Sequence, residues 1–102
     1  MKENAGNILL VEDDKSMVVL LKFNLEQAGY SVDPFGNAES ALEFCQQHTP
    51  NLIISDVQLP GMSGLEFRQA LQADARLEKV PFVFLTASAQ EDEISRGRKL
   101  DI

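Results

Sequence analysis

Polar residues that could do chemistry follow three short apolar runs of the sequence, at the points where the runs end. In chain order they are Glu12, Asp13, Asp14, Asp56 and Thr86. Short continuous apolar runs are typical of parallel strands that are covered on both faces. Because open parallel sheets bind ligands at the carboxyl ends of their strands, we expect these five side chains to converge at one edge of a sheet.

The carboxylates of this group indicate a site for a hard divalent cation. Like charges gathered in one cleft repel each other, so at least one carboxyl pKa should rise when no cation is present. Oxygen ligands suit Mg²⁺, and two carboxylates plus a carbonyl would suffice because Mg²⁺ keeps several waters. A carboxylate left partly free could then attack phosphorus and form an acyl phosphate, to which Thr86 could donate a hydrogen bond. The alternative is that Asp13 or Asp14 merely caps the following helix.

The segment around Asp56 defines its surroundings most fully. The apolar run Leu52–Ile54 predicts a buried strand that ends at Asp56. A turn at Leu59–Gly61 follows, and Ser63 with Glu66 three positions later forms a capping box that starts a helix. Asp56 is therefore expected at the carboxyl end of a buried strand, beneath a tight loop.

The remaining chain alternates strands and helices. We expect a buried strand at 8–11, an edge strand at 30–35, where Pro34 cannot donate to a ladder, and a strong strand at 80–86. The resulting order, β-α-β-α-β-α-β-α, predicts an α/β fold with a parallel sheet, helices on both faces and right-handed crossovers.

Several helix boundaries can be predicted. Asn37 is a plausible N-cap, with Glu39 favourable in the first turn and facing water. Gly29 should end the preceding helix, whose apolar face is predicted from five residues at helical spacing: Met17, Leu20, Leu21, Leu25 and Ala28. Residues 74–79 are predicted to be a polar connection, and a last helix is predicted to begin near Gln90.

Composition restricts the function classes. The 102 residues are 44% hydrophobic, enough for one domain with a single core. Nine Lys and Arg against 16 Asp and Glu leave a net charge of -7, which repels nucleic acid and anionic membranes. The polar N-terminus lacks the apolar region of a signal peptide, and no apolar run approaches a membrane span, so we expect a cytoplasmic protein.

Two residue types that occur once are expected to be structural. Cys45 shares the helical phase of Ala41 and Leu42, which predicts a core position rather than a redox sensor. A single cysteine also excludes an internal disulfide and a cysteine-based zinc site. His48 is expected at the polar end of its helix, away from the acidic residues, rather than as a phosphoryl relay.

The sequence resembles the receiver domain of two-component response regulators from residue 8 to about residue 100. Three segments carry the resemblance, each at the matching strand end: Ile8–Asp14, Ser55–Gly64 and Val80–Ala87. The resemblance implies a flavodoxin-like, doubly wound parallel sheet with strand order 2-1-3-4-5.

The resemblance also implies roles for individual residues. Asp56 corresponds to the phospho-acceptor, and Glu12 and Asp13 correspond to the acidic pair, with Asp13 as a direct Mg²⁺ ligand and Glu12 acting through water. Two Asp are more frequent at this pair, and Glu at its first position is a familiar variant. The backbone carbonyl of Gln58 corresponds to another metal ligand, and Thr86 corresponds to the switch hydroxyl.

The function implied is a phosphoryl-accepting switch in a phosphorelay. Asp56 would receive a phosphoryl group from a histidine kinase or phosphotransfer protein and would alter binding to a downstream effector domain or protein. Such a domain modifies itself and is not an enzyme acting on a free substrate. Two alternatives remain: a degenerate receiver that works by protein contact alone, and a phosphohydrolase, which Gln58 disfavours because such enzymes commonly place a second Asp there.

The resemblance departs from the family at the C-terminus. The sequence ends at Ile102, before the fifth strand, its lysine and the fifth helix of the family. We therefore expect residues 1–102 to be a receiver domain that is incomplete at its C-terminal end, either a fragment or a degenerate form. Without a fifth strand, the fourth becomes an exposed edge, which predicts a dimer or an exchange of elements through Phe82–Leu85, or a cleaved remainder that stays bound there.

Overall fold

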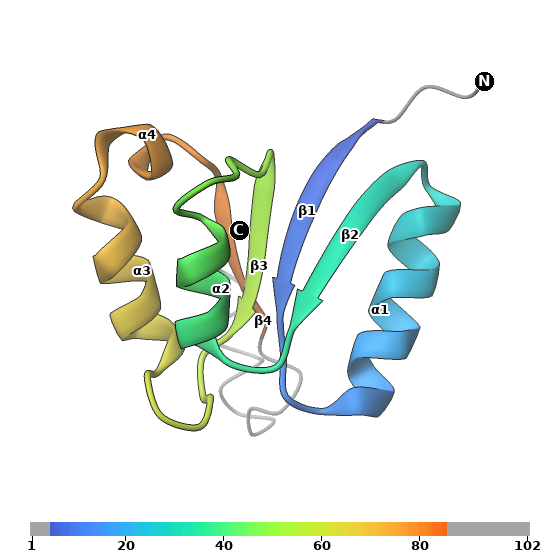
Figure 1. The fold of residues 1–102 in the computed structure, drawn as a ribbon. Helices are drawn as coiled ribbons and strands as arrows, with labels where there is room; N and C mark the ends of the chain where they lie inside the picture. The colour runs from blue at the N-terminus through green and yellow to red at the C-terminus, as the bar shows by residue number, and fades with distance from the viewer. Residues whose placement is uncertain (1–4, 86–102) are drawn as a thin grey trace, which may run out of the picture.

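The computed structural model describes residues 5–85, which form a four-stranded sheet with helices on both faces (Figure 1). The strands are β1 (Gly6–Val11), β2 (Tyr30–Phe35), β3 (Leu52–Asp56) and β4 (Phe82–Leu85). Their order is β2-β1-β3-β4, and every neighbouring pair is parallel. The predicted order 2-1-3-4 is confirmed, as is the edge position of the strand that contains Pro34.

Helices connect consecutive strands and cover the two faces of the sheet unequally. Helix α1 (Lys15–Gln27) lies on one face, and α2 (Ala38–Phe44) and α3 (Gly64–Gln72) lie on the other, with the short α4 (Ala75–Glu78) beside α3 (Figure 1). All four strands point their carboxyl ends toward the bottom of this view, so the loops that follow β1, β2 and β3 gather there.

Strand β1 is buried on both faces, as its continuous apolar run predicts. Leu9 and Val11 contribute to a larger hydrophobic cluster beneath α2 and α3, which also contains Phe67 and Leu71. Successive side chains of a strand point to opposite faces. The alternate residues of β1 therefore join Val32 in a smaller cluster beneath α1, whose buried members are Ile8, Leu10 and Val32.

Side-chain caps fix the starts of the helices. The Asn37 side chain accepts a hydrogen bond from the Ser40 amide at 2.8 Å, and Ser63 and Glu66 form a reciprocal capping box. Both predicted caps are confirmed. Gly29 follows α1 with φ at 102°, a left-handed conformation that glycine adopts without a steric penalty, which explains the helix stop predicted there.

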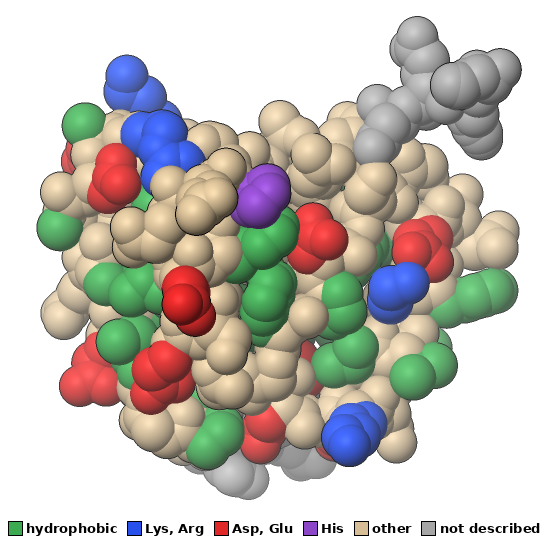
Figure 2. All heavy atoms as spheres, in the orientation of Figure 1, with side chains coloured by type: hydrophobic (Ala, Val, Ile, Leu, Met, Phe, Trp, Pro, Cys, Tyr) green, Lys and Arg blue, Asp and Glu red, His purple; other side chains and the backbone are tan. Residues whose placement is uncertain are grey.

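The predicted apolar face of α1 is wrong at Leu20 and Ala28. Leu20 is 55% exposed, and Val19 and Phe23 are exposed beside it, so hydrophobic side chains lie on the surface over α1 (Figure 2). Val18, Leu21 and Leu25 pack toward the sheet instead, at the i, i+3, i+7 spacing of one helix face. Every position from 17 to 21 is apolar, so the sequence offers two competing helix faces, and hydrophobicity alone does not show which one is buried.

The prediction of a polar connection at residues 74–79 is also wrong. Asp74 accepts a hydrogen bond from the Arg76 amide at 2.9 Å and caps the one-turn helix α4. Leu77 is buried in the larger cluster and anchors this turn. One apolar residue among polar ones is too weak a pattern to predict a helix, although its burial is what holds the segment against the domain.

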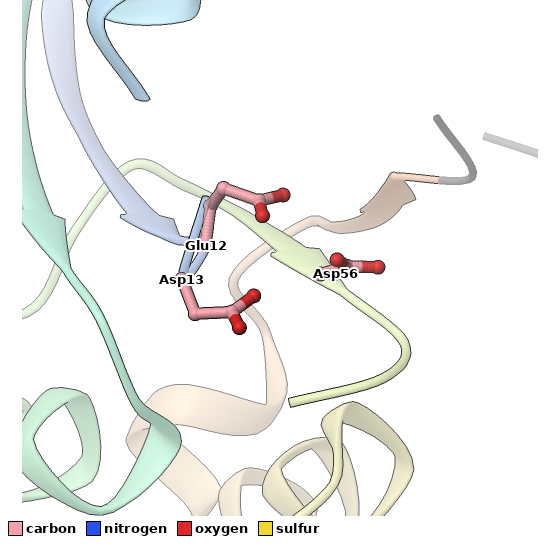
Figure 3. A group of neighbouring side chains, drawn as sticks. All are labelled: Glu12, Asp13 and Asp56. Atoms are coloured by element: carbon pink, nitrogen blue, oxygen red, sulfur yellow. The ribbon is translucent and has the colours of Figure 1, made fainter. Parts of the chain in front are cut away.

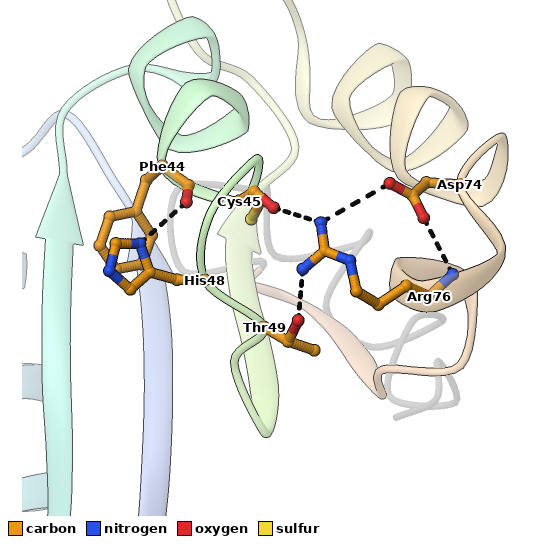
Figure 4. A network of polar contacts seen from close by, with 6 residues as sticks. All are labelled: Phe44, Cys45, His48, Thr49, Asp74 and Arg76. Carbon is orange, nitrogen blue, oxygen red and sulfur yellow. Dashed lines mark hydrogen bonds and ion pairs between the residues drawn. The ribbon is translucent and has the colours of Figure 1, made fainter.

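Arg76 joins α4 to the end of α2 (Figure 4). Its guanidinium donates to the Cys45 carbonyl at 2.6 Å and to the Thr49 hydroxyl, and forms an ion pair with Asp74 at 3.7 Å. The Cys45 side chain is fully buried, as predicted, and burial raises the pKa of its thiol. His48 is exposed and stacks on Phe44 with ring centroids 4.2 Å apart, which agrees with its predicted surface position.

Within residues 5–85, β4 pairs with β3 and with no other strand. The dimer through Phe82–Leu85 stays a prediction. Thr86 and the helix predicted near Gln90 lie outside the described residues. In the described part of the chain, no helix has both the length and the apolar character needed to span a membrane.

Replacing Leu71 with Ala should lower the free energy of unfolding by about 2–5 kcal/mol, because Leu71 is 2% exposed and its removal leaves a cavity in the core. Leu65→Ala is the matched control on the same helix. Its side chain is 55% exposed, so the loss should stay within about 0.5 kcal/mol. Urea denaturation measures both values, and equal losses would contradict the packing of α3 described above.

Candidate functional site

The parallel pairing of β1 with β3 brings the acidic strand ends together. Val11 is in register with Ser55, so the residues that follow them, Glu12 and Asp56, meet at the carboxyl edge of the sheet. One carboxylate oxygen from each of Glu12, Asp13 and Asp56 lies within 4.8 Å of the others (Figure 3). The predicted convergence of these three residues is therefore present.

Burial makes the repulsion within this acidic cluster costly. Glu12 is 5% exposed and Asp56 is 4% exposed, while Asp13 is open to solvent. Burial raises the pKa of Glu12, and the nearby charges of Asp56, Asp13 and Asp14 raise it further, although a hydrogen bond from the Asp14 amide at 2.9 Å opposes them. A positive ion between the carboxylates would relieve this conflict.

The donor set of the acidic cluster fits Mg²⁺. All three side chains offer oxygen, the ligand atom that this ion requires. With Mg²⁺–O distances of about 2.1 Å, two oxygens on opposite sides of the ion are about 4.2 Å apart. A small movement of the side chains, or one water between the ion and a carboxylate, therefore brings the observed spacing into range.

The structure does not place the other predicted site residues, Asp14, Gln58 and Thr86, in the acidic cluster. The Asp14 side chain accepts hydrogen bonds from the Ser16 and Met17 amides at 2.9 and 3.3 Å and caps α1, which is the structural alternative for this residue. Gln58 is exposed in the loop between β3 and α3. Thr86 lies outside the described residues.

Gly64 has a positioning role that the sequence did not reveal. Its amide donates to the Val57 carbonyl at 2.8 Å, and a Cβ at this position would overlap the Asp56 carbonyl oxygen. The buried Ser55 hydroxyl donates to that same carbonyl at 2.9 Å. The start of α3 therefore packs directly on the backbone that carries Asp56, and only glycine allows this approach. In the sequence, only the position of Gly64 directly after the N-cap Ser63 could have indicated this role.

A pocket of about 370 Å³ opens beside the acidic cluster. Glu12 and Asp13 form its acidic end, Val18 and Val19 of α1 form one wall, and the end of β2 forms the other. The cluster is therefore bordered by an apolar surface on the α1 side.

Comparison with known proteins shows which family this chain resembles. Residues 8–102 match the family model of the response regulator receiver domain. The phosphate regulon transcriptional regulatory protein PhoB of Rhizobium meliloti is 39% identical over 90 residues, which cover 88% of this chain and 40% of PhoB. The polar-differentiation response regulator DivK of Brucella anthropi is 33% identical over 93 residues, which cover 91% of this chain and 76% of DivK. The chain thus spans less than half the length of PhoB.

Solved structures show the same fold. The chemotaxis response regulator CheY4 of Vibrio cholerae superposes with a TM-score of 0.78 at 29% identity, covering 91% of this chain and 78% of CheY4. The signal receiver domain of a signal transduction histidine kinase from Syntrophus aciditrophicus has a TM-score of 0.79 at 34% identity, covering 93% of this chain and 72% of that chain.

Replacing Glu12 with Gln should stabilise the metal-free protein at neutral pH. The raised pKa means that the folded protein holds the Glu12 proton more tightly than the unfolded chain, so stability falls as pH rises from 4.5 through the folded value. Gln carries no charge and still accepts from the Asp14 amide. Its gain in unfolding free energy should therefore appear at about pH 7 and vanish below the unfolded pKa.

Urea denaturation in EDTA at both pH values measures this gain, with the exposed Glu43→Gln on α2 as the control. A gain of equal size at low and neutral pH would mean that removal of the buried charge is not its cause.

Gly64→Ala should destabilise the domain by about 1–3 kcal/mol, because the added methyl group displaces either α3 or the Asp56 backbone. Gly36→Ala is the control, since a Cβ there meets nothing within 4 Å, and its effect should stay within about 0.5 kcal/mol. Thermal or urea unfolding compares the two variants. If Gly64→Ala were as stable as Gly36→Ala, the close packing of α3 on Asp56 would be refuted.

Proposed function

The chain belongs to the response regulator receiver domain family, and from this premise we propose that it is a Mg²⁺-dependent, phosphoryl-accepting switch of two-component signalling. Receiver domains are signalling domains rather than enzymes acting on a free substrate. The observation that carries the proposal is the meeting of Glu12, Asp13 and Asp56 at one edge of the sheet, with two of the three carboxylates buried. Without a cation, the repulsion among these three carboxylates would only lower the stability of the fold.

Asp56 is the phospho-acceptor in this proposal. Asp56 lies at the carboxyl end of β3. Its backbone packs against Gly64, and its carbonyl accepts a hydrogen bond from the Ser55 hydroxyl. A nucleophile that is fixed in this way loses little freedom on reaching the transition state. The exposed Asp13 and the buried Glu12 lie close to it and would help to hold the ion.

The proposed step is transfer of a phosphoryl group to the Asp56 carboxylate. An Asp56 oxygen attacks the phosphorus of a phosphohistidine, the new O–P bond forms as the N–P bond breaks, and the electron pair stays on the imidazole nitrogen. The product is an acyl phosphate on Asp56. Hydrolysis of the O–P bond by water returns the carboxylate and releases inorganic phosphate, which resets the switch.

The ligands proposed for Mg²⁺ are Glu12, Asp13, Asp56 and the backbone carbonyl of Gln58. When bound, the ion supplies positive charge that screens the incoming phosphoryl oxygens. Asp13, which faces solvent, would bind the ion directly, whereas the buried Glu12 carboxylate, which accepts a hydrogen bond from the Asp14 amide, would hold it through a water.

The proposed partners are a protein donor and an effector. The donor is a histidine kinase or a phosphotransfer protein, and the pocket that Glu12 and Asp13 line at one end offers a contact for it beside the acidic cluster. The Thr86 hydroxyl, which follows β4, is proposed to turn toward the phosphoryl group and bias the surface that a downstream effector domain or protein recognises. The net charge of -7 argues against direct nucleic-acid binding.

Incubation with phosphoramidate and Mg²⁺ should add one phosphoryl group per chain, measured by intact-protein mass spectrometry. Asp56→Asn should abolish this labelling, because the amide is not a nucleophile toward phosphorus, and EDTA should abolish it in the wild-type protein. Asp33→Asn on β2 is a matched control and should label normally. A folded wild-type protein that stays unlabelled would overturn the proposal and favour a module that acts by protein contact alone.

A further inference from the structure

The side chain of Glu39 extends beyond its own helix and contacts the loop that follows Asp56. It lies in the first turn of α2, and its Oε2 accepts a hydrogen bond from the Met62 amide at 2.9 Å, across 23 positions of sequence. The start of α2 and the loop between β3 and α3 lie at the same end of the molecule (Figure 1). The expectation that Glu39 serves only the first turn of its helix and faces water is therefore incomplete.

The loop is shaped to receive this carboxylate. Gly61 has φ at 73°, the left-handed region that favours glycine, and a Cβ there would lie 2.5 Å from Glu39 Oε2. The turn thus directs the Met62 amide toward Glu39 and leaves no side chain in the way. A charged acceptor on a backbone amide makes a stronger hydrogen bond than a neutral one.

The held loop is the one that carries Gln58. At its start, the Val57 carbonyl accepts from the Gly64 amide at 2.8 Å, and at its end Ser63 and Glu66 close the capping box. Gln58 and the turn at Leu59–Gly61 lie between these two fixed ends. The hydrogen bond from the Met62 amide to the Glu39 carboxylate, directly after this turn, attaches the loop to α2. Helix α2 contributes no residue to the acidic cluster.

We propose that Glu39 is a positioning residue for the metal site. By holding the Met62 amide, it keeps the loop 57–63 in the conformation in which the Gln58 carbonyl joins Glu12, Asp13 and Asp56 around the ion. The proposal rests on the function proposed above, and it adds a residue on a different helix that acts through the loop backbone.

A simpler role for Glu39 would be its favourable charge at the N-terminus of α2. Two substitutions separate the roles. Glu39→Asp keeps the charge in the first turn but is one methylene too short to reach Met62, whereas Glu39→Gln removes the charge but keeps an oxygen that can accept from the Met62 amide. Glu43→Ala, at an exposed position one turn further along the same helix, is the control.

The measurement is a Mg²⁺ titration of each variant followed by backbone amide chemical shifts, together with its melting temperature. We expect Glu39→Asp and Glu39→Ala to weaken Mg²⁺ affinity roughly tenfold, the size of effect seen when support behind a metal ligand is removed. Glu39→Gln, which keeps a weaker hydrogen bond to the Met62 amide, should lose less Mg²⁺ affinity than Glu39→Asp, and Glu43→Ala should bind as the wild type does. The Met62 amide shift should change in Glu39→Asp and Glu39→Ala but not in Glu43→Ala.

The outcomes distinguish the two proposals. If wild type and Glu43→Ala bind Mg²⁺ and Glu39→Asp binds it equally well, the positioning role is refuted while the proposed function stands. If Glu39→Gln loses affinity and Glu39→Asp does not, the charge at the helix start is what matters, and the role of the Met62 contact is again refuted. If wild type itself does not bind Mg²⁺ through Asp56, the proposed function fails and the positioning role fails with it.

Discussion

Mutual repulsion of three carboxylates is the constraint around which this domain is arranged. A folded protein ordinarily keeps such charges apart or in water, yet Glu12 and Asp56 are nearly inaccessible and share one corner with Asp13. The sheet tolerates this because the strands that carry these residues are anchored by apolar side chains on both faces. The packing of the core thus offsets the repulsion within this group of charges.

Backbone contacts, more than side-chain contacts, fix the geometry of that corner. The register of β1 and β3 sets Glu12 beside Asp56, and Gly64 sets the distance between α3 and the Asp56 backbone. The loop after Asp56 is then held from α2 by Glu39. Each contact involves a peptide group, so the positions of the acidic residues are set largely through the backbone that carries them.

The sequence predicts those parts of the structure that depend on local patterns. The buried runs, the caps Asn37 and Ser63 and the acidic strand ends were all predictable, because each depends on neighbours within about four residues. The face of α1 was not, since Leu20 and Val18 are both apolar and only packing selects between them. The α4 turn depends on a single buried residue, Leu77. The contacts of Gly64 with Asp56 and of Glu39 with Met62 join distant parts of the chain, and neither hydrophobic period nor composition encodes them.

Helix α1 differs from the rest of the domain in how it is held. None of its residues is buried, whereas α3 buries Gly64, Phe67 and Leu71. Its half-buried Val18, Leu21 and Leu25 pack on the smaller cluster, so α1 is held through one partly exposed apolar face. Its first turn is nevertheless joined to the acidic corner, because Asp14 caps α1 while its amide bonds to Glu12. The acidic corner and the first turn of α1 are therefore joined through a single residue, Asp14.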